Sequence, residues 1–361
     1  MAKINEGDVI EGLFSIGLAL YIADGKIDKS KLNKLRSKVE PTMFTTGRVK
    51  LVVADEVSRK SGNHPPDRFT VVVEMRLKPA SVDGAFGKDF NKIYYSKSKD
   101  IGKIDHKIDQ LVKAVGSSAF SSKVRSIVHK FLDNNKREKV VFVVVADGIA
   151  GESSGGEIKG DVTLNTYAEI KGKRKLITGG SLPFSLKSGS VTVANLSPYK
   201  GMLDIAEALK IDWDGKTKYD RLSKPFSGPT EMAAKFKLIK KMYDELKTEV
   251  VKESKKTGGA GKKFTEHCLD FLGKSIFGED RASVVDIQEN KVKEITPEYF
   301  DILKQTVELM IEARGNNLVF VDKKSKQPIF QIRTKLRPPP ANEAKFYLEV
   351  GKGIYSPELN K

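Results

Sequence analysis

Cysteine is almost absent from this chain of 361 residues, and histidine is scarce. The single cysteine, Cys268, excludes an intramolecular disulfide and fits a reducing compartment. It lies in residues 264–269, whose pattern predicts an amphipathic helix, so we expect Cys268 in the core rather than acting as a nucleophile. The four histidines are scattered without the spacing of zinc ligands, which excludes a structural zinc site.

Long apolar runs are also lacking. No stretch of about 18 consecutive apolar residues occurs, so the sequence predicts no membrane span. The most apolar early stretch, residues 9–23, contains Glu11 and has no basic segment before it, so it predicts a buried helix and not a signal peptide. We therefore expect a cytoplasmic protein.

Positive charge is abundant. The chain has 64 Lys and Arg against 47 Asp and Glu, a formal net charge of +17. An excess of this size favours a polyanionic partner, of which nucleic acid is the commonest, although a basic chain can also serve solubility alone. Hydrophobic residues make up 39% of the chain, enough to bury a core and to argue against wholesale disorder.

Hydrophobic periodicity predicts a mixed α/β protein, with a central mixed sheet flanked by helices. We expect three stretches: 1–135 with a first helix, a β-hairpin and further helices; 136–215 with core strands; and 216–361 with helices and late strands. The expected helices are 5–24, 29–39, 101–135, 200–210, 229–253 and 297–314. The expected strands are 47–57, 68–78, 140–146, 160–170, 182–187, 318–322 and 329–336, with a last segment at 345–350.

One constellation carries chemistry. Asp161 begins an expected strand, and Lys187 lies on the next one. Phosphodiester hydrolysis needs a carboxylate to hold Mg²⁺, which polarises the phosphate and lowers the pKa of a bound water. A nearby lysine can orient that water or stabilise the developing negative charge.

These residues resemble the PD-(D/E)XK superfamily, the fold of restriction endonucleases. That family places an aspartate at the start of the second core strand, an acidic-x-lysine on the third, and often a glutamate on the first helix. Asp161, Lys187 and Glu11 match these positions. Further short matches are to phage and restriction-system members: Glu6-Gly7 to Glu11-Gly12, the Ser-Leu-Lys at 185–187, and the late segments 330–335 and 347–353.

The resemblance implies a Mg²⁺-dependent DNA endonuclease, with Mn²⁺ as an alternative metal. In that reading Asp161 and Glu11 hold the metal, Lys187 stabilises charge or orients water, and Ser185 contacts the scissile phosphate. It also implies DNA as the partner, and it allows a homodimer because restriction-like enzymes are often dimers.

The chain departs from the family pattern at Ser185, which stands where the acidic residue is expected and is a poor Mg²⁺ ligand. This favours the alternative of a non-catalytic DNA-binding or virion-associated protein that keeps the fold. Acidic-x-lysine tripeptides close by, at 157–159 and 169–171, show that the tripeptide alone is a weak signal. The order of helix glutamate, strand aspartate and next-strand lysine carries the assignment.

Basic segments supply candidate DNA contacts. The run at 171–175 predicts a solvated hairpin tip facing the DNA backbone, and Arg333 and Lys335 alternate along a late strand, where charge could equally protect a sheet edge. The glycine-lysine run 255–263 predicts a linker and lacks the spacing of a phosphate-binding loop. The candidate contacts are Lys171, Lys173, Arg174, Lys175, Arg333 and Lys335.

Overall fold

The computed structural model is a mixed α/β protein that divides into two compact units. Unit 1 comprises residues 1–189, 279–294 and 356–361, and unit 2 comprises 190–278 and 295–355. Each unit joins segments that are distant in sequence, so this division cuts the chain differently from the three sequence stretches. The structure describes residues 6–37, 48–59, 67–77, 101–115, 118–134, 139–149, 161–187, 192–287, 292–338, 340–341, 343–351 and 354.

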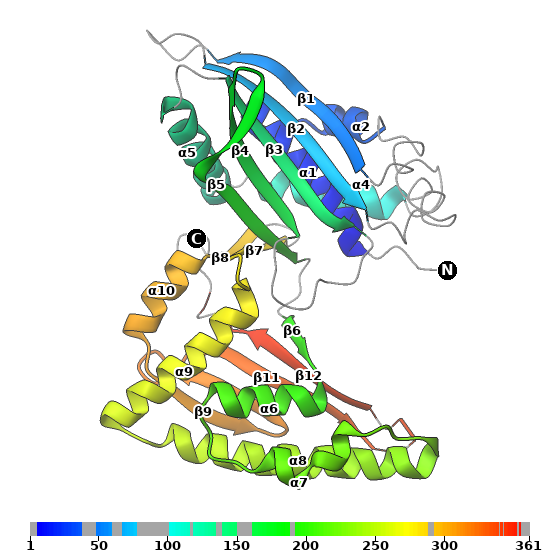
Figure 1. Cartoon of the computed structure of the whole chain (residues 1–361), viewed down its shortest axis with the longest axis vertical. Helices are drawn as coiled ribbons and strands as arrows, with labels where there is room; N and C mark the ends of the chain where they lie inside the picture. The colour runs from blue at the N-terminus through cyan, green and yellow to red at the C-terminus, as the bar shows by residue number, and fades with distance from the viewer. Residues whose placement is uncertain are drawn as a thin grey trace. The chain divides into compact units, whose positions relative to one another are not determined.

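Unit 1 is built on a seven-stranded mixed sheet in the order β1-β2-β3-β4-β5-β7-β8 (Figure 1). Strand β2 pairs with β3 in parallel, and β5 pairs with β7 in parallel. Between these two pairs, β3, β4 and β5 form an antiparallel meander. The strands are β1 (Arg48–Arg59), β2 (Asp67–Leu77), β3 (Lys139–Ile149), β4 (Val162–Ile170), β5 (Lys173–Lys187), β7 (Ser283–Ile287) and β8 (Val292–Ile295).

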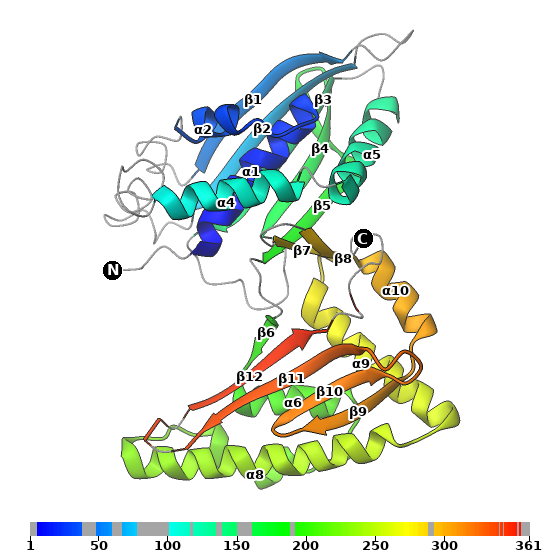
Figure 2. The same ribbon diagram turned by 180° about the vertical axis from the view of Figure 1, so that it is seen from behind.

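Helices cover one face of this sheet, as the view from behind shows (Figure 2). Helix α1 (Glu6–Asp24) packs on β1, β2, β3 and β5 and is buried along nearly all of residues 12–23. Gly17 permits close packing of α1 against the helix that contains Leu111, because a Cβ on Gly17 would lie 3.1 Å from Leu111 Cδ2. The other helices are α2 (Lys29–Ser37), α4 (Ile101–Val115) and α5 (Ser118–Asn134).

Unit 2 has a five-stranded antiparallel sheet in the order β6-β12-β11-β10-β9, with its long helices on one face (Figures 1 and 2). Tyr243 on α8 and Phe346 on β12 meet edge to face, with ring centroids 5.2 Å apart. Its strands are β6 (Thr192–Leu196), β9 (Leu309–Arg314), β10 (Asn317–Asp322), β11 (Pro328–Arg337) and β12 (Glu343–Val350). Its helices are α6 (Pro198–Ala208), α7 (Gly215–Lys218), η3 (Asp220–Ser223), α8 (Gly228–Ser254), α9 (Gly258–Phe277) and α10 (Pro297–Thr306).

The expected mixed α/β class is confirmed, as are the first helix and the hairpin β1-β2. Cys268 is fully buried in α9, and this burial raises the pKa of its thiol well above the usual value. Thr296 caps α10, accepting a hydrogen bond from the Tyr299 amide at 3.1 Å, with Pro297 at the first helical position.

Three element predictions are wrong. The helix expected at 297–314 ends at Thr306, because residues 309–314 alternate between buried and partly exposed positions and form β9. The expected linker 255–263 contains the start of α9, which begins at Gly258 and lets Gly261 lie against the Lys256 carbonyl. Strand β5 begins at Lys173, nine residues before the expected start at 182, so the basic run belongs to the turn and the strand.

Candidate functional site

Asp161 and β5 form the centre of the candidate site. Asp161 directly precedes β4, and its amide donates to the Phe184 carbonyl at 2.8 Å. Its carboxylate Oδ2 accepts hydrogen bonds from the Leu186 amide at 2.7 Å and from the Ser185 hydroxyl at 3.2 Å. Because a strand amide lies in the plane of the sheet, this carboxylate closes the end of the β4-β5 ladder.

The environment of Asp161 disfavours the charged form of its carboxyl group. Burial raises the pKa of the Asp161 carboxyl above its usual value, and the negative charge of Asp280 adds to this. The positive charge of Lys187 and the hydrogen bonds from Leu186 and Ser185 lower the same pKa, but burial outweighs them. A raised pKa in a polar cluster is typical of functional carboxyl groups, although structural networks also produce it.

Alternation along β5 decides which side chains share a face. Phe184 and Leu186 pack in the core with α1, and the Phe14 and Phe184 rings meet edge to face at 5.9 Å. Ser185 and Lys187 therefore point to the face away from α1. The structure thus brings Asp161, Ser185 and Lys187 together.

Glu11 lies on α1, one turn before Phe14, on the helix that covers the opposite face. Its expected role as a metal ligand stays a prediction.

A carboxylate on the neighbouring strand β7 was not predicted from the sequence. Asp286 lies directly beside Lys187 in the parallel pair β5-β7, so the two side chains share a face of the sheet. Its side chain is 1% exposed, in a five-residue strand that is buried throughout. An aspartate inside the apolar run Ser283–Ile287 is the signal that could have revealed it, because charged residues are seldom fully buried without a partner.

The donor set limits which metal fits. Within the described ranges, no three His, Cys, Asp or Glu side chains come together as a metal-binding group. This disfavours a cage made by protein ligands alone. Mg²⁺ is commonly held through one or two carboxylates, with waters and substrate phosphates completing its shell, and Asp161 fits that mode because both of its described hydrogen bonds fall on Oδ2.

The far end of the same hairpin carries the basic run. Lys171 and Gly172 form the turn with positive φ angles of 50° and 76°, and residues 170–176 are all exposed. In the part of the chain that the structure describes, Lys171, Lys173, Arg174 and Lys175 form no ion pair. The tripeptide 169–171 sits here too, eight residues from Asp161 or roughly 27 Å along an extended strand, so Glu169 cannot share a metal with Asp161.

The cations of β11, unlike those of the β4-β5 turn, form ion pairs. Arg333 Nε donates to Glu349 Oε1 at 2.6 Å, and its guanidinium lies 4.4 Å from the centre of the Tyr347 ring. Gln331 also donates to Glu349, at 2.7 Å. Lys335 pairs with Glu343 at 3.2 Å. Both predicted DNA contacts on this strand are therefore engaged with carboxylates of the chain itself.

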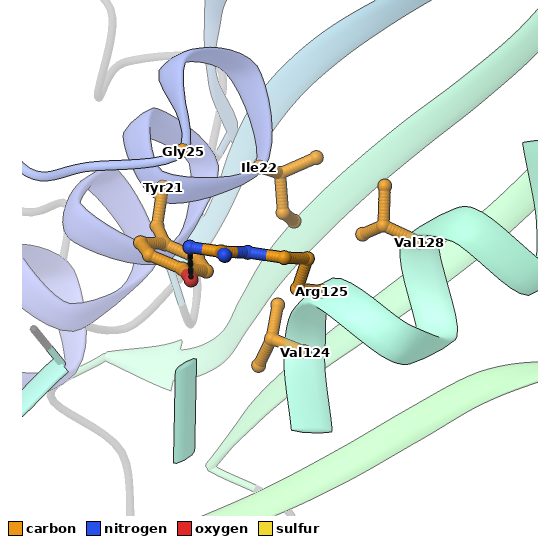
Figure 3. A pocket seen from close by; sticks show the side chains of 6 residues that line it. All are labelled: Tyr21, Ile22, Gly25, Val124, Arg125 and Val128. Carbon is orange, nitrogen blue, oxygen red and sulfur yellow. Dashed lines mark hydrogen bonds between the residues drawn. The ribbon is translucent and has the colours of Figure 1, made fainter. Parts of the chain in front are cut away.

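Described residues of unit 1 line a smaller and a larger cavity. The smaller, between α1 and α5, has a volume of about 10 Å³, and Arg125 crosses it to donate to the Tyr21 hydroxyl at 3.0 Å (Figure 3). It has room for one water molecule at most. The larger, of about 90 Å³, lies between α5 and the strands β4 and β5.

Comparison with protein-family models, curated proteins and solved structures gives no match. None of the helices within the described ranges is both long and apolar enough to cross a membrane.

Proposed function

We propose that this protein is a Mg²⁺-dependent DNA endonuclease of the restriction-endonuclease-like type. One observation carries the proposal: Asp161, at the start of β4, shares hydrogen bonds with β5 next to Lys187. This is the order of aspartate and lysine that the resemblance requires, on adjacent strands of a mixed sheet.

The residues of the site divide the work between them. Asp161 would hold Mg²⁺ through its carboxylate. The bound metal would supply the charge that polarises the phosphate and lowers the pKa of a bound water. Lys187 lies on the same face as Ser185, where its ammonium can stabilise negative charge on the phosphate. Ser185 donates its hydroxyl to Asp161 at 3.2 Å and so holds the carboxylate in one orientation.

DNA as substrate is supported by the charge of the chain. The net charge is +17, and the cations of the β4-β5 turn are exposed and outside any described ion pair. Such cations bind a phosphate backbone by releasing its counterions.

A second candidate is a DNA-binding protein without catalysis. It is favoured by the two hydrogen bonds to Asp161 Oδ2, because a carboxylate that closes a β-ladder has a structural role without any metal.

Plasmid cleavage separates the two. Supercoiled DNA is incubated with the protein in Mg²⁺, Mn²⁺ or EDTA. We expect nicking in either metal and none in EDTA, and we expect Lys187→Ala to abolish nicking because the transition state loses its cation. Lys210→Ala, an exposed lysine of unit 2, is the matched control and should cut like the parent. DNA that is bound but stays intact in both metals would favour the binding protein.

A further inference from the structure

The hairpin of β4 and β5 carries the candidate site at one end and the basic turn at the other. Strand β4 pairs with β3 from Val162 to Glu169 and with β5 from Val162 to Ile170, with one register shift in the β5 pairing. A central strand of this kind is among the most stable parts of a fold, so it holds its two ends at a fixed distance. Eight residues separate Asp161 from Glu169, or roughly 27 Å along the strand.

Alternation along β4 places both of these ends on one face. The even-numbered residues from 162 to 168 are buried, and Val162 and Leu164 pack in the core with α1. The odd-numbered residues are partly exposed and point away from α1, on the face of the sheet that lies in front of α1 in Figure 1. We call this set the outer face of β4: Asp161, Thr163, Asn165, Tyr167 and Glu169.

Each end of the outer face has a cation beside it. Lys187 lies next to the site, on the same face as Ser185 and Asp161. Arg174 lies directly opposite Glu169 in the antiparallel pair β4-β5, so its side chain shares the outer face at the other end. Neither Lys187 nor Arg174 forms an ion pair among the described residues. Both are therefore available to bind phosphate.

The residues between the two ends suit a bound polyanion. Thr163, Asn165 and Tyr167 are uncharged and partly exposed, and each has a side chain that can form hydrogen bonds. Such side chains commonly contact phosphate and sugar, which positions DNA without reading its sequence. The carboxylates of the outer face, Asp161 and Glu169, lie at its ends, so no negative charge of this set interrupts the path between them.

We propose that duplex DNA runs along the outer face of β4, with the scissile phosphate at Asp161 and Lys187 and a distal phosphate at Arg174. At about 3.4 Å per phosphate of one strand, roughly 27 Å corresponds to about eight base pairs. The protein then cuts only where the duplex continues for about eight base pairs on one side of the cut. This inference rests on the proposed function for cleavage and adds a length requirement for the substrate.

Mapping of nicks near DNA ends tests this requirement. Linear blunt duplexes of mixed sequence are incubated with the protein and Mg²⁺, and the nicks in each strand are located by sequencing. We expect nicks to stop about eight base pairs short of one end of each strand and to approach the other end more closely, because the distal contact lies on one side of the site. An excluded zone at neither end, or of equal width at both ends, contradicts the inference.

Arg174→Gln removes the distal cation without touching the site. Nicks inside the excluded zone should become as frequent as those in the interior of the duplex. The slope of log affinity against log salt, measured by fluorescence anisotropy in EDTA, should fall by about 1 because one phosphate contact is lost. Arg314→Gln is the matched control, because Arg314 on β9 of unit 2 pairs with Glu312 at 2.6 Å, and it should keep both the zone and the slope.

The flanking lysines could replace Arg174, so Lys173, Arg174 and Lys175 are also replaced by glutamine together. An excluded zone that survives both the single and the triple variant overturns the proposed path of the DNA.

The outcomes also separate this inference from the proposed function. If linear DNA is cut without an excluded zone, the inference alone fails. If no DNA is cut in Mg²⁺ or Mn²⁺, the proposed function fails, and the binding measurements in EDTA still test the path. A salt slope that is unchanged in both the Arg174→Gln and the triple variant then shows that DNA does not lie along β4.

Discussion

The two basic regions predicted from the sequence differ in how the fold treats their charge. The cations at 171–175 extend from the β4-β5 turn and form no ion pair among the described residues. Arg333 and Lys335 lie on the strand β11 of unit 2. Each of them forms an ion pair with a carboxylate of the next strand, Arg333 with Glu349 and Lys335 with Glu343. A basic residue in the sequence is therefore not equivalent to an available positive charge, since cross-strand neighbours decide whether it can reach a phosphate.

This difference predicts unequal contributions to DNA binding. Replacing Lys173, Arg174 and Lys175 together by glutamine should reduce the slope of log affinity against log salt by about 3, because each cation releases about one counterion. Replacing Arg333 and Lys335 by glutamine should change that slope by less than about 1. Anisotropy titrations over a range of salt concentrations measure both slopes, and equal losses would show that the ion pairs of unit 2 open when DNA binds.

The same comparison predicts a stability effect in unit 2. Glu349 is 5% exposed and accepts hydrogen bonds from Gln331, Arg333 and Thr192. Glu349→Gln removes the negative charge that pairs with Arg333. Because Arg333 is itself partly exposed, we expect a loss of about 1–2 kcal/mol in the free energy of unfolding. DNA affinity should stay equal or rise, because Arg333 is released.

Glu312→Gln is the control for this variant. Glu312 pairs with Arg314 on the same strand at 2.6 Å, near the surface. It should cost no more than about 0.5 kcal/mol in urea denaturation, as exposed pairs usually do. Equal losses at Glu349 and Glu312 would mean that burial of Glu349 adds nothing to its ion pair.

Local patterns predicted much of the fold. The helix at 6–24, the hairpin β1-β2 and the buried strand β3 follow from apolar periodicity and β-branched runs. The strands β7 and β8 were missed because they are short and lie about 100 residues after β5, so their place in the same sheet depends on long-range pairing. A sequence pattern of this length does not specify such a partner.

The candidate site shows the same limit. The order of Asp161, Ser185 and Lys187 in the sequence was enough to place them on adjacent strands. The hydrogen bond from Ser185 to Asp161 and the position of Asp286 beside Lys187 depend on register, which only the folded sheet defines.

The most direct test of the account is cleavage by Asp161→Asn, measured together with DNA affinity and thermal stability at pH 7. The raised pKa of Asp161 means that its charged form costs stability as the pH rises through that pKa, so the neutral amide should leave the melting temperature equal or higher. We predict that metal-dependent nicking is lost while DNA affinity stays within about twofold, because Mg²⁺ prefers an anionic oxygen. A variant that folds, binds DNA and cuts it as fast as the parent would contradict the central claim.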